Sequence, residues 1–129
     1  MFTVEQIKAA HSHVPRGAAF PKYIQDIKQL GVTAFGTWVV DSHTDYFGKD
    51  HYQAKSNPMY ENLAIAADSN KEKFNHCLKI HQQGETDYFR FCKDCAETGI
   101  EKWFVCLDTM TCTYYDKAGN KILVEQIPE

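Results

Sequence analysis

Along this chain, apolar residues recur first with the spacing of helices and then with that of strands, and this succession occurs twice. Residues 2–58 and residues 70–128 each predict two helices, a glycine that ends the second helix, and three short strands. We therefore predict an α+β fold built from a duplicated α-α-β-β-β unit. An antiparallel sheet should pack against the helices, with a pseudo-twofold axis relating the two halves.

Capping and turn residues set the expected boundaries in the first half. Thr3 and Gln6 have the spacing of a capping box, so the first helix should begin there. Gly31 should end the second helix in a left-handed conformation. Strands are predicted over residues 32–40, 44–47 and 51–55, with a turn at residues 41–43.

The second half shows the same signals after a connector over residues 59–69. Asp68 or Ser69 is expected to cap the third helix, and Thr86 the fourth. Gly99 should end the fourth helix. Strands are predicted over residues 103–107, 111–115 and 121–127, with a hairpin turn at residues 117–120.

The two halves also align residue by residue at a few positions. Asp26, Gly31 and Tyr46 correspond at one offset to Asp94, Gly99 and Tyr114. At 129 residues, the chain is long enough for one domain with a buried core, so we predict a single domain over residues 1–129.

Charge and cysteine content limit the classes of partner and compartment. The formal net charge is −3 and the sequence pI is near 6.0, which argues against nucleic-acid and membrane-surface binding. The apolar runs are too short to cross a bilayer, and the first residues lack the basic start and apolar core of an export signal. The five cysteines are therefore expected to be reduced thiols in the cytoplasm.

Four residues on two neighbouring predicted helices have the types and spacing of metal ligands. Cys77 and His81 are separated by three residues, and Cys92 and Cys95 by two, so each pair lies on one helix face. Packing of the two helices would bring four zinc ligands together. All four also lie on apolar stripes, where buried cysteine is common, and we favour core packing without a cofactor.

A second group of candidates lies at the predicted hairpin tips. Asp41 and His43 provide a carboxylate and an imidazole at the first tip, and Asp108 lies at the second. An aspartate before a tight turn is also ordinary turn chemistry. His11 and His81 occupy matching helix ends and would approach each other if the pseudo-twofold holds.

Aromatic residues lie on the predicted strands of both halves. Strand alternation sends some of them away from the helices, where an aromatic sheet face is typical of a binding surface. We predict a ligand-binding patch that combines these aromatics with the hairpin tips. Its residues are Trp38, Asp41, His43, Tyr46, Asp108 and Tyr114.

Several longer runs of the chain also resemble a known family. They include residues 5–12, 23–26, 81–88, 99–103 and 110–120, the last reading Met-Thr-Cys-Thr-Tyr-Tyr-Asp-Lys-Ala-Gly-Asn. These runs resemble a YdfO-like bacterial family of unknown function, whose members occur in prophage regions and often carry the label phage envelope protein. The resemblance implies a compact α+β domain. It brings no catalytic residue to this chain.

We therefore predict a non-enzymatic binding module of the cytoplasm, whose partner is a protein or a small molecule. We expect no nucleic acid and no membrane as partner, and a homodimer stays open. The alternative is a small enzyme or zinc-binding protein that uses the groove between the halves. The sequence contains no nucleophile elbow, phosphate loop, dinucleotide fingerprint or HExxH motif.

Overall fold

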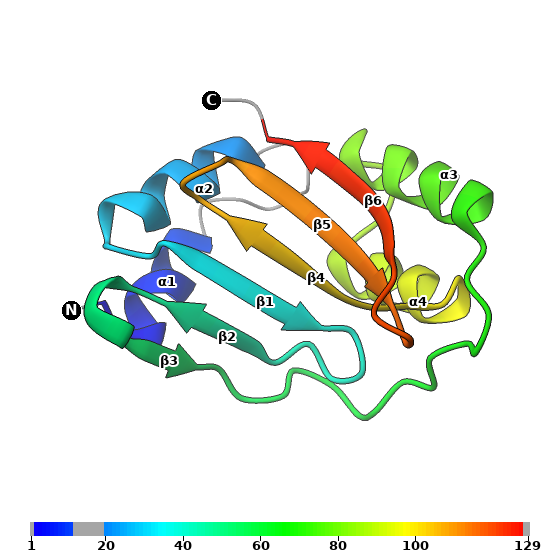
Figure 1. The fold of residues 1–129 in the computed structure, drawn as a ribbon, viewed down its shortest axis with the longest axis horizontal. Coiled ribbons are helices and arrows are strands. Elements are labelled where there is room, and N and C mark those ends of the chain that lie inside the picture. The colour runs from blue at the N-terminus through cyan, green and yellow to red at the C-terminus, as the bar shows by residue number, and fades with distance from the viewer. Residues whose placement is uncertain (1, 12–19, 128–129) are drawn as a thin grey trace.

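The computed structural model describes residues 2–11 and 20–127 and shows a two-layer α+β fold (Figure 1). The elements of the first half are α1 (Val4–His11), α2 (Phe20–Gln29), β1 (Ala34–Trp38), β2 (Thr44–Phe47), a 3-10 turn (Lys49–His51) and β3 (Gln53–Lys55). Those of the second half are α3 (Lys71–Gln82), α4 (Tyr88–Glu97), β4 (Ile100–Cys106), β5 (Thr111–Asp116) and β6 (Lys121–Gln126). The predicted α+β class with an antiparallel sheet is confirmed.

The six strands form one antiparallel sheet in the order β3-β2-β1-β4-β5-β6. The first strands of the two halves, β1 and β4, are therefore neighbours at its centre. All four helices lie on one face of this sheet, and the opposite face is turned toward the viewer in Figure 1. We call this opposite side the open face.

Local signals explain where several helices begin and end. The backbone N–H of Thr3 donates to Gln6 Oε1 at 2.8 Å and that of Gln6 donates to Thr3 Oγ1 at 3.2 Å, so the predicted capping box is confirmed. Gly31 and Gly99 have φ of +105° and +83°, as expected of residues that follow a helix in the left-handed conformation.

The predicted caps of α3 and α4 were wrong by one or two residues. Asn70 caps α3 by accepting from Lys73 N, and Asp87 caps α4 by accepting from Arg90 N. The start of α3 is set by a long-range contact, because Asn70 N donates to the carbonyl of Thr98 at 2.9 Å. The predicted cap Thr86 is instead bound to the ring of His81.

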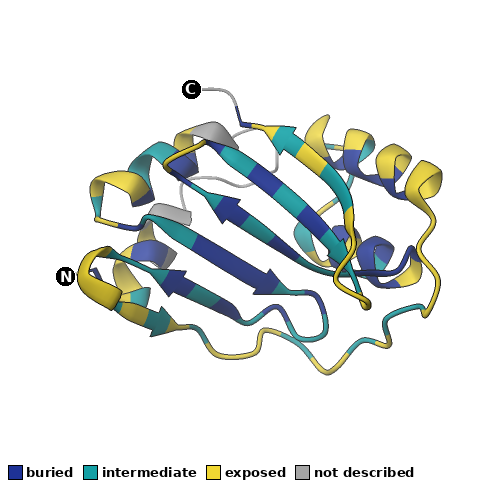
Figure 2. Cartoon of the chain, viewed as in Figure 1, coloured by how far each residue is buried: buried dark blue, intermediate teal, exposed yellow. Residues whose placement is uncertain are grey.

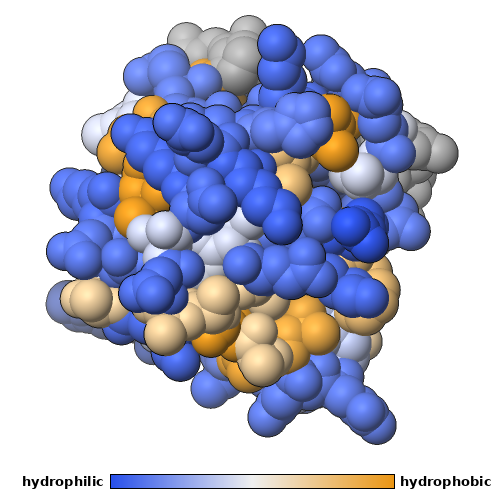
Figure 3. All heavy atoms as spheres, turned by 90° about the vertical axis from the view of Figure 1, so that its right-hand side faces the viewer, coloured by the Kyte–Doolittle hydropathy of each residue, from blue (hydrophilic) through white to orange (hydrophobic). Residues whose placement is uncertain are grey.

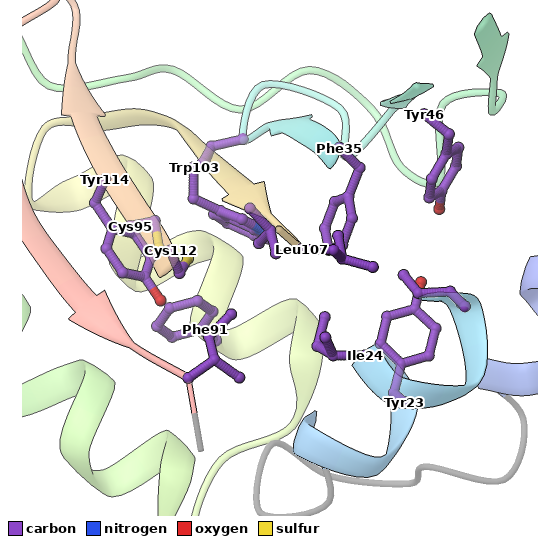
Figure 4. Packing of buried hydrophobic residues seen from close by; sticks show 14 of the residues in the cluster. Tyr23, Ile24, Phe35, Tyr46, Phe91, Cys95, Trp103, Leu107, Cys112 and Tyr114 are labelled. Carbon is purple, nitrogen blue, oxygen red and sulfur yellow. The ribbon is translucent and has the colours of Figure 1, made fainter. Parts of the chain in front are cut away.

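The core lies between the helices and the inner face of the sheet. Tyr23 of α2 packs edge-on against Phe35 of β1, with ring centroids 6.5 Å apart. In the second half, Phe91 of α4 lies 5.7 Å from Trp103 of β4. Figure 4 shows these aromatic rings together with the fully buried Leu107, which fills the space between the two pairs of helices.

The two halves pair their strands in the same register. Gly31 and Gly99 are 68 residues apart, and every β1–β2 pair, moved by 68 residues, is a β4–β5 pair. Phe35↔Tyr46, for example, becomes Trp103↔Tyr114. The central pair Gly36↔Phe104 is related to itself by the same offset, so a pseudo-twofold axis would pass through it. The duplication stays a prediction, and the shared register supports it.

The connector between β3 and α3 follows the edge of the molecule and is tied to both halves. Leu63 N donates to Val40 O at 2.7 Å, and Ala66 N donates to Ala96 O at 2.8 Å. Figure 3 looks at the end that holds α3 and α4, where the surface is mostly hydrophilic and apolar atoms gather in its lower part. Among the described residues, none of the helices has the length and apolar character needed to cross a membrane.

Candidate functional site

The open face carries aromatic side chains that alternate with the buried positions of the strands. Buried and half-buried residues alternate along β2 and β5 (Figure 2). Tyr46 and Tyr114 belong to the buried set that faces the helices. The half-buried aromatics of the open face are Trp38, Phe47, Phe104 and Tyr115.

One row across the open face combines two aromatic rings and a lysine. Trp38 pairs with Lys102, and Lys102 pairs with Tyr115, so the three residues stand side by side on β1, β4 and β5. The Nζ atom of Lys102 lies 4.8 Å from the ring centroid of Trp38 and 5.2 Å from that of Tyr115. Cation–π attraction thus holds the ammonium group between the two rings.

The neighbouring row is shaped by a glycine. A Cβ at Gly36 would lie 3.3 Å from Cδ1 of Phe104, so the missing side chain leaves room for this ring. Phe104 also lies 6.3 Å from Phe47 between ring centroids. The place where the pseudo-twofold axis would meet the open face is therefore covered by an aromatic ring, not by a groove of polar groups.

Asp41 and His43 form a hydrogen-bonded pair at the β1–β2 turn. Asp41 Oδ1 lies 2.5 Å from Nδ1 of His43 and accepts from its backbone N–H at 2.9 Å. Burial raises the pKa of Asp41, but these two hydrogen bonds outweigh it, so that the pKa lies below its usual value. The imidazole ring lies nearly parallel to Trp38, which connects the pair to the open face.

The residue between them has no free hydroxyl for chemistry. Ser42 adopts a left-handed conformation with φ of +63°, which sends its side chain inward. Its Oγ atom lies 2.6 Å from the hydroxyl of Tyr88, and its exposed fraction is 1%. The Asp41–His43 pair therefore has the geometry of an oriented general base, but Ser42 is not placed as its nucleophile.

The structure brings only part of the predicted patch together. Trp38, Asp41 and His43 are in contact. Tyr46 lies on the helix face of the sheet, where its hydroxyl and that of Tyr23 point toward each other (Figure 4). Asp108 is exposed in the β4–β5 turn, which lies at the other end of the sheet from the β1–β2 turn (Figure 1).

Tyr114, the last residue of the predicted patch, is also buried. It packs on Phe74 with ring centroids 4.9 Å apart and donates to Glu125 Oε1 at 3.4 Å. Burial raises the pKa of its hydroxyl well above the usual value. Tyr46 and Tyr114 thus stabilise the core and do not reach the open face.

The four residues considered as metal ligands lie in the core of the second half. Cys77, Cys92 and Cys95 are buried free thiols, as predicted, and Cys92 and Cys95 have no exposed surface. The ring of His81 stacks on Phe91 at 4.4 Å, and its Nδ1 atom lies 3.1 Å from Thr86 O. Within residues 2–11 and 20–127, no three His, Cys, Asp or Glu side chains converge as a metal site requires.

The predicted approach of His11 to His81 is not open to description. The side chain of His11 lies outside the described residues. His81 is accounted for by its ring stacking and by its bond to Thr86.

Comparison with known proteins identifies a family. Residues 8–126 match the family described as "Protein of unknown function (DUF1398)". The chain belongs to this family. No curated protein matches this DUF1398 chain.

Sequence reasoning missed two members of the open face of this DUF1398 protein, Lys102 and Phe104. Lys102 stands next to Trp38 only because β1 pairs with β4, and these residues are far apart in the sequence. Phe104 alternates with Trp103 and Val105, so strand periodicity was the signal that could have placed it outward.

Proposed function

We propose that this DUF1398 protein is a non-enzymatic binding module that holds its partner on the open face. The observation that carries this proposal is the set of half-buried aromatics Trp38, Phe47, Phe104 and Tyr115 on a sheet face that has no described helix over it. Aromatic side chains bury much apolar area with few rotatable bonds, so they dominate binding surfaces. Val124 of β6, 53% exposed, extends the apolar area on the same side.

The proposal includes the finer statements that the resemblance suggests. We place the protein in the cytoplasm, as a YdfO-like protein of prophage origin, with a protein or small molecule as the first classes of partner to test. Its five free thiols fit a reducing compartment.

The second candidate function is a small enzyme, and one observation favours it. Asp41 orients the ring of His43 through Nδ1, which leaves Nε2 pointing away from its carboxylate partner. This arrangement is typical of a general base. It ranks second because the adjacent hydroxyl, Ser42, is buried and bound to Tyr88. The zinc alternative is ranked below it, since the Cys and His side chains do not converge in the part of the chain that the structure describes.

The experiment is a thermal-shift screen of nucleotides, peptides and metabolites on purified protein. Each ligand that raises the melting temperature is tested again on Tyr115→Ala and Lys102→Ala, and on Phe89→Ala as a control. Phe89 is an exposed aromatic of α4, in the other layer of the molecule. Stabilisation lost in both open-face variants and kept in the control supports the proposal. Stabilisation kept in the open-face variants contradicts it.

The same screen separates the two candidate functions. A ligand that is converted to a product by the wild type, and not by His43→Ala, would favour the enzyme. The Asp41→Asn variant should then lose activity as well, because an amide does not hold the imidazole in the same protonation state.

A further inference from the structure

We infer that the open face binds single-stranded nucleic acid, with bases stacked on Trp38 and Tyr115 and a phosphate drawn to Lys102 between them. This inference deepens the proposed binding function and rests on it. It departs from the prediction made from net charge, because the structure shows how the charges are distributed.

The row Trp38–Lys102–Tyr115 has the parts that single-strand binding needs. Bases of any sequence stack on aromatic rings, and cationic side chains attract the phosphates that join them. The two rings stand two strands apart, at about 10 Å. The ammonium group of Lys102 lies between them, within 5.2 Å of both ring centroids. A phosphate that links bases stacked on these rings would meet this cation.

The rings are also held in place before any ligand binds. Trp38 Nε1 donates to Asp45 Oδ2 at 3.4 Å, which orients the indole. Phe104 lies over Gly36 and close to Phe47, so the next row offers a further aromatic surface. Side chains that are already ordered lose less entropy when a flexible strand binds.

The charge of the open face has the sign that a polyanion requires. Lys55 pairs with Asp45, and Lys121 pairs with Tyr115, so both lysines stand on the same side of the sheet as Lys102. Three lysines against one aspartate give this face +2. Because the whole chain carries −3, the other residues total −5. The net charge therefore describes the helical side and the loops, whereas the open face attracts anions.

The same charges disfavour a second copy of the chain on this face. Two open faces packed together would bring three lysines against three lysines, which costs free energy unless anions come between them. An acidic peptide would match the charge but offers few flat rings for stacking. It is the alternative outcome of the test.

The test is fluorescence anisotropy with a labelled oligothymidylate of about 15 nucleotides at about 50 mM salt. If three lysines each neutralise one phosphate, the slope of log K against log salt is about −2, so fourfold more salt weakens binding about 20-fold. Lys102→Ala should reduce that slope to about −1.4. Tyr115→Ala should weaken binding about 5- to 150-fold, while Tyr115→Phe keeps the ring and most of the affinity.

The control is Lys71→Ala, which removes an exposed lysine of α3 on the helix side. It should leave both affinity and slope unchanged, and circular dichroism checks that every variant is folded. Oligothymidylate binding that Lys102→Ala and Tyr115→Ala do not change would overturn the inference. So would the absence of oligothymidylate binding together with binding of poly-glutamate that depends on Lys102.

The two levels of the proposal fail in different ways. Poly-glutamate binding that depends on Lys102 overturns the nucleic-acid inference and keeps the open face as the binding surface. If neither polyanion binds, the nucleic-acid inference is again wrong. The thermal-shift screen then decides on the binding module, because its ligands need not be anions.

Discussion

At the scale of single residues, burial controls the ionisation of this protein more than charge pairing does. His81 is an example, because its ring lies on Phe91 within the second half. Burial lowers the pKa of His81 below its ordinary value of 6.5, and the nearby Thr86 carbonyl, Asp87 and Asp94 offset this only in part. The folded protein therefore holds the ring neutral at a pH where the unfolded chain binds a proton.

This gives a pH dependence with a definite sign. Below pH 6.5 the unfolded chain takes up a proton that folded His81 does not, so the free energy of unfolding should fall as the pH is lowered. Above pH 6.5 this contribution is fully present. Urea unfolding at pH 7.5 and pH 5.5 should show the fall in wild type and a smaller fall in His81→Phe. The control His76→Phe changes an exposed residue of the same helix and should behave like wild type.

The thiols provide a second prediction at this scale. Burial raises the pKa of Cys92 and Cys95, whereas the side-chain hydroxyl and backbone N–H of Thr109 lower the pKa of half-buried Cys106. Because the thiolate is the reactive form, a thiol reagent should label Cys106 first and leave Cys92 and Cys95 until the protein unfolds. Mass spectrometry of peptides identifies the labelled site. Labelling of Cys92 at the rate of Cys106 would contradict the burial.

Replacement of Cys92 tests its packing role separately. Cys92→Ala should cost about 1 kcal/mol in the free energy of unfolding, since a small buried side chain is lost. Cys92→Asp should cost much more, because it places a charge where the exposed fraction is 0%. Zinc in purified protein at one atom per chain, lost in Cys92→Ser, would contradict the core assignment.

At the scale of elements, the connector and α4 are joined at Gly99. A Cβ at this position would lie 2.6 Å from Asp68 O and 2.7 Å from Ser69 Cα, so the connector crosses directly over the glycine. Gly119, in the β5–β6 turn, also has a positive φ, of +86°, but a Cβ there would meet nothing within 4 Å. The two glycines share the backbone conformation and differ in the neighbouring chain.

This difference makes them a matched pair. Gly119→Ala should cost about 1–2 kcal/mol, the strain of an alanine in the left-handed region. Gly99→Ala should cost at least about 3 kcal/mol, because the backbone of the connector or of α4 has to move as well. Urea unfolding measures both. Equal costs would show that the connector does not approach Gly99 closely.

The elements themselves could largely be predicted from the sequence, because they depend on local periodicity. Thr3 and Gln6 form the predicted cap, and the strands appear where β-branched and aromatic residues were dense. The start of α3 could not be predicted, since Asp68, Ser69 and Asn70 are all good caps. The choice falls on Asn70 because its N–H is bound to Thr98, a contact between distant segments.

The candidate site was less predictable for a related reason. β2 and β5 each carry aromatics at two successive positions, Tyr46 with Phe47 and Tyr114 with Tyr115. Alternation requires that one of each pair faces the helices, but the pattern does not say which one. The sequence-based patch included Tyr46 and Tyr114, which are the buried members. The half-buried members, Phe47 and Tyr115, stand on the open face.

At the scale of the whole molecule, the strand register is the main support for an internal duplication. The offset of 68 residues that relates the β1–β2 pairs to the β4–β5 pairs also relates other contacts. Val39 N donates to Glu101 O and Leu107 N donates to Thr33 O, both at 2.9 Å. Two ion pairs follow the same offset: Lys22–Asp26 and Arg90–Asp94, each at 3.2 Å. Contacts that arose independently would not be expected to share one offset.

We therefore expect an experimental structure to superpose Tyr23 to Phe47 on Phe91 to Tyr115 as one helix–strand–strand unit. The correspondence should hold without a gap through Tyr115 and then shift by one residue, because β6 is irregular opposite Tyr114 and Tyr115. A duplicated unit retains its register while single side chains diverge, which would explain why the open face joins Trp38 from one half to Lys102 and Tyr115 from the other. Different topologies in the two halves, or a register that needs several gaps within these segments, would contradict the duplication.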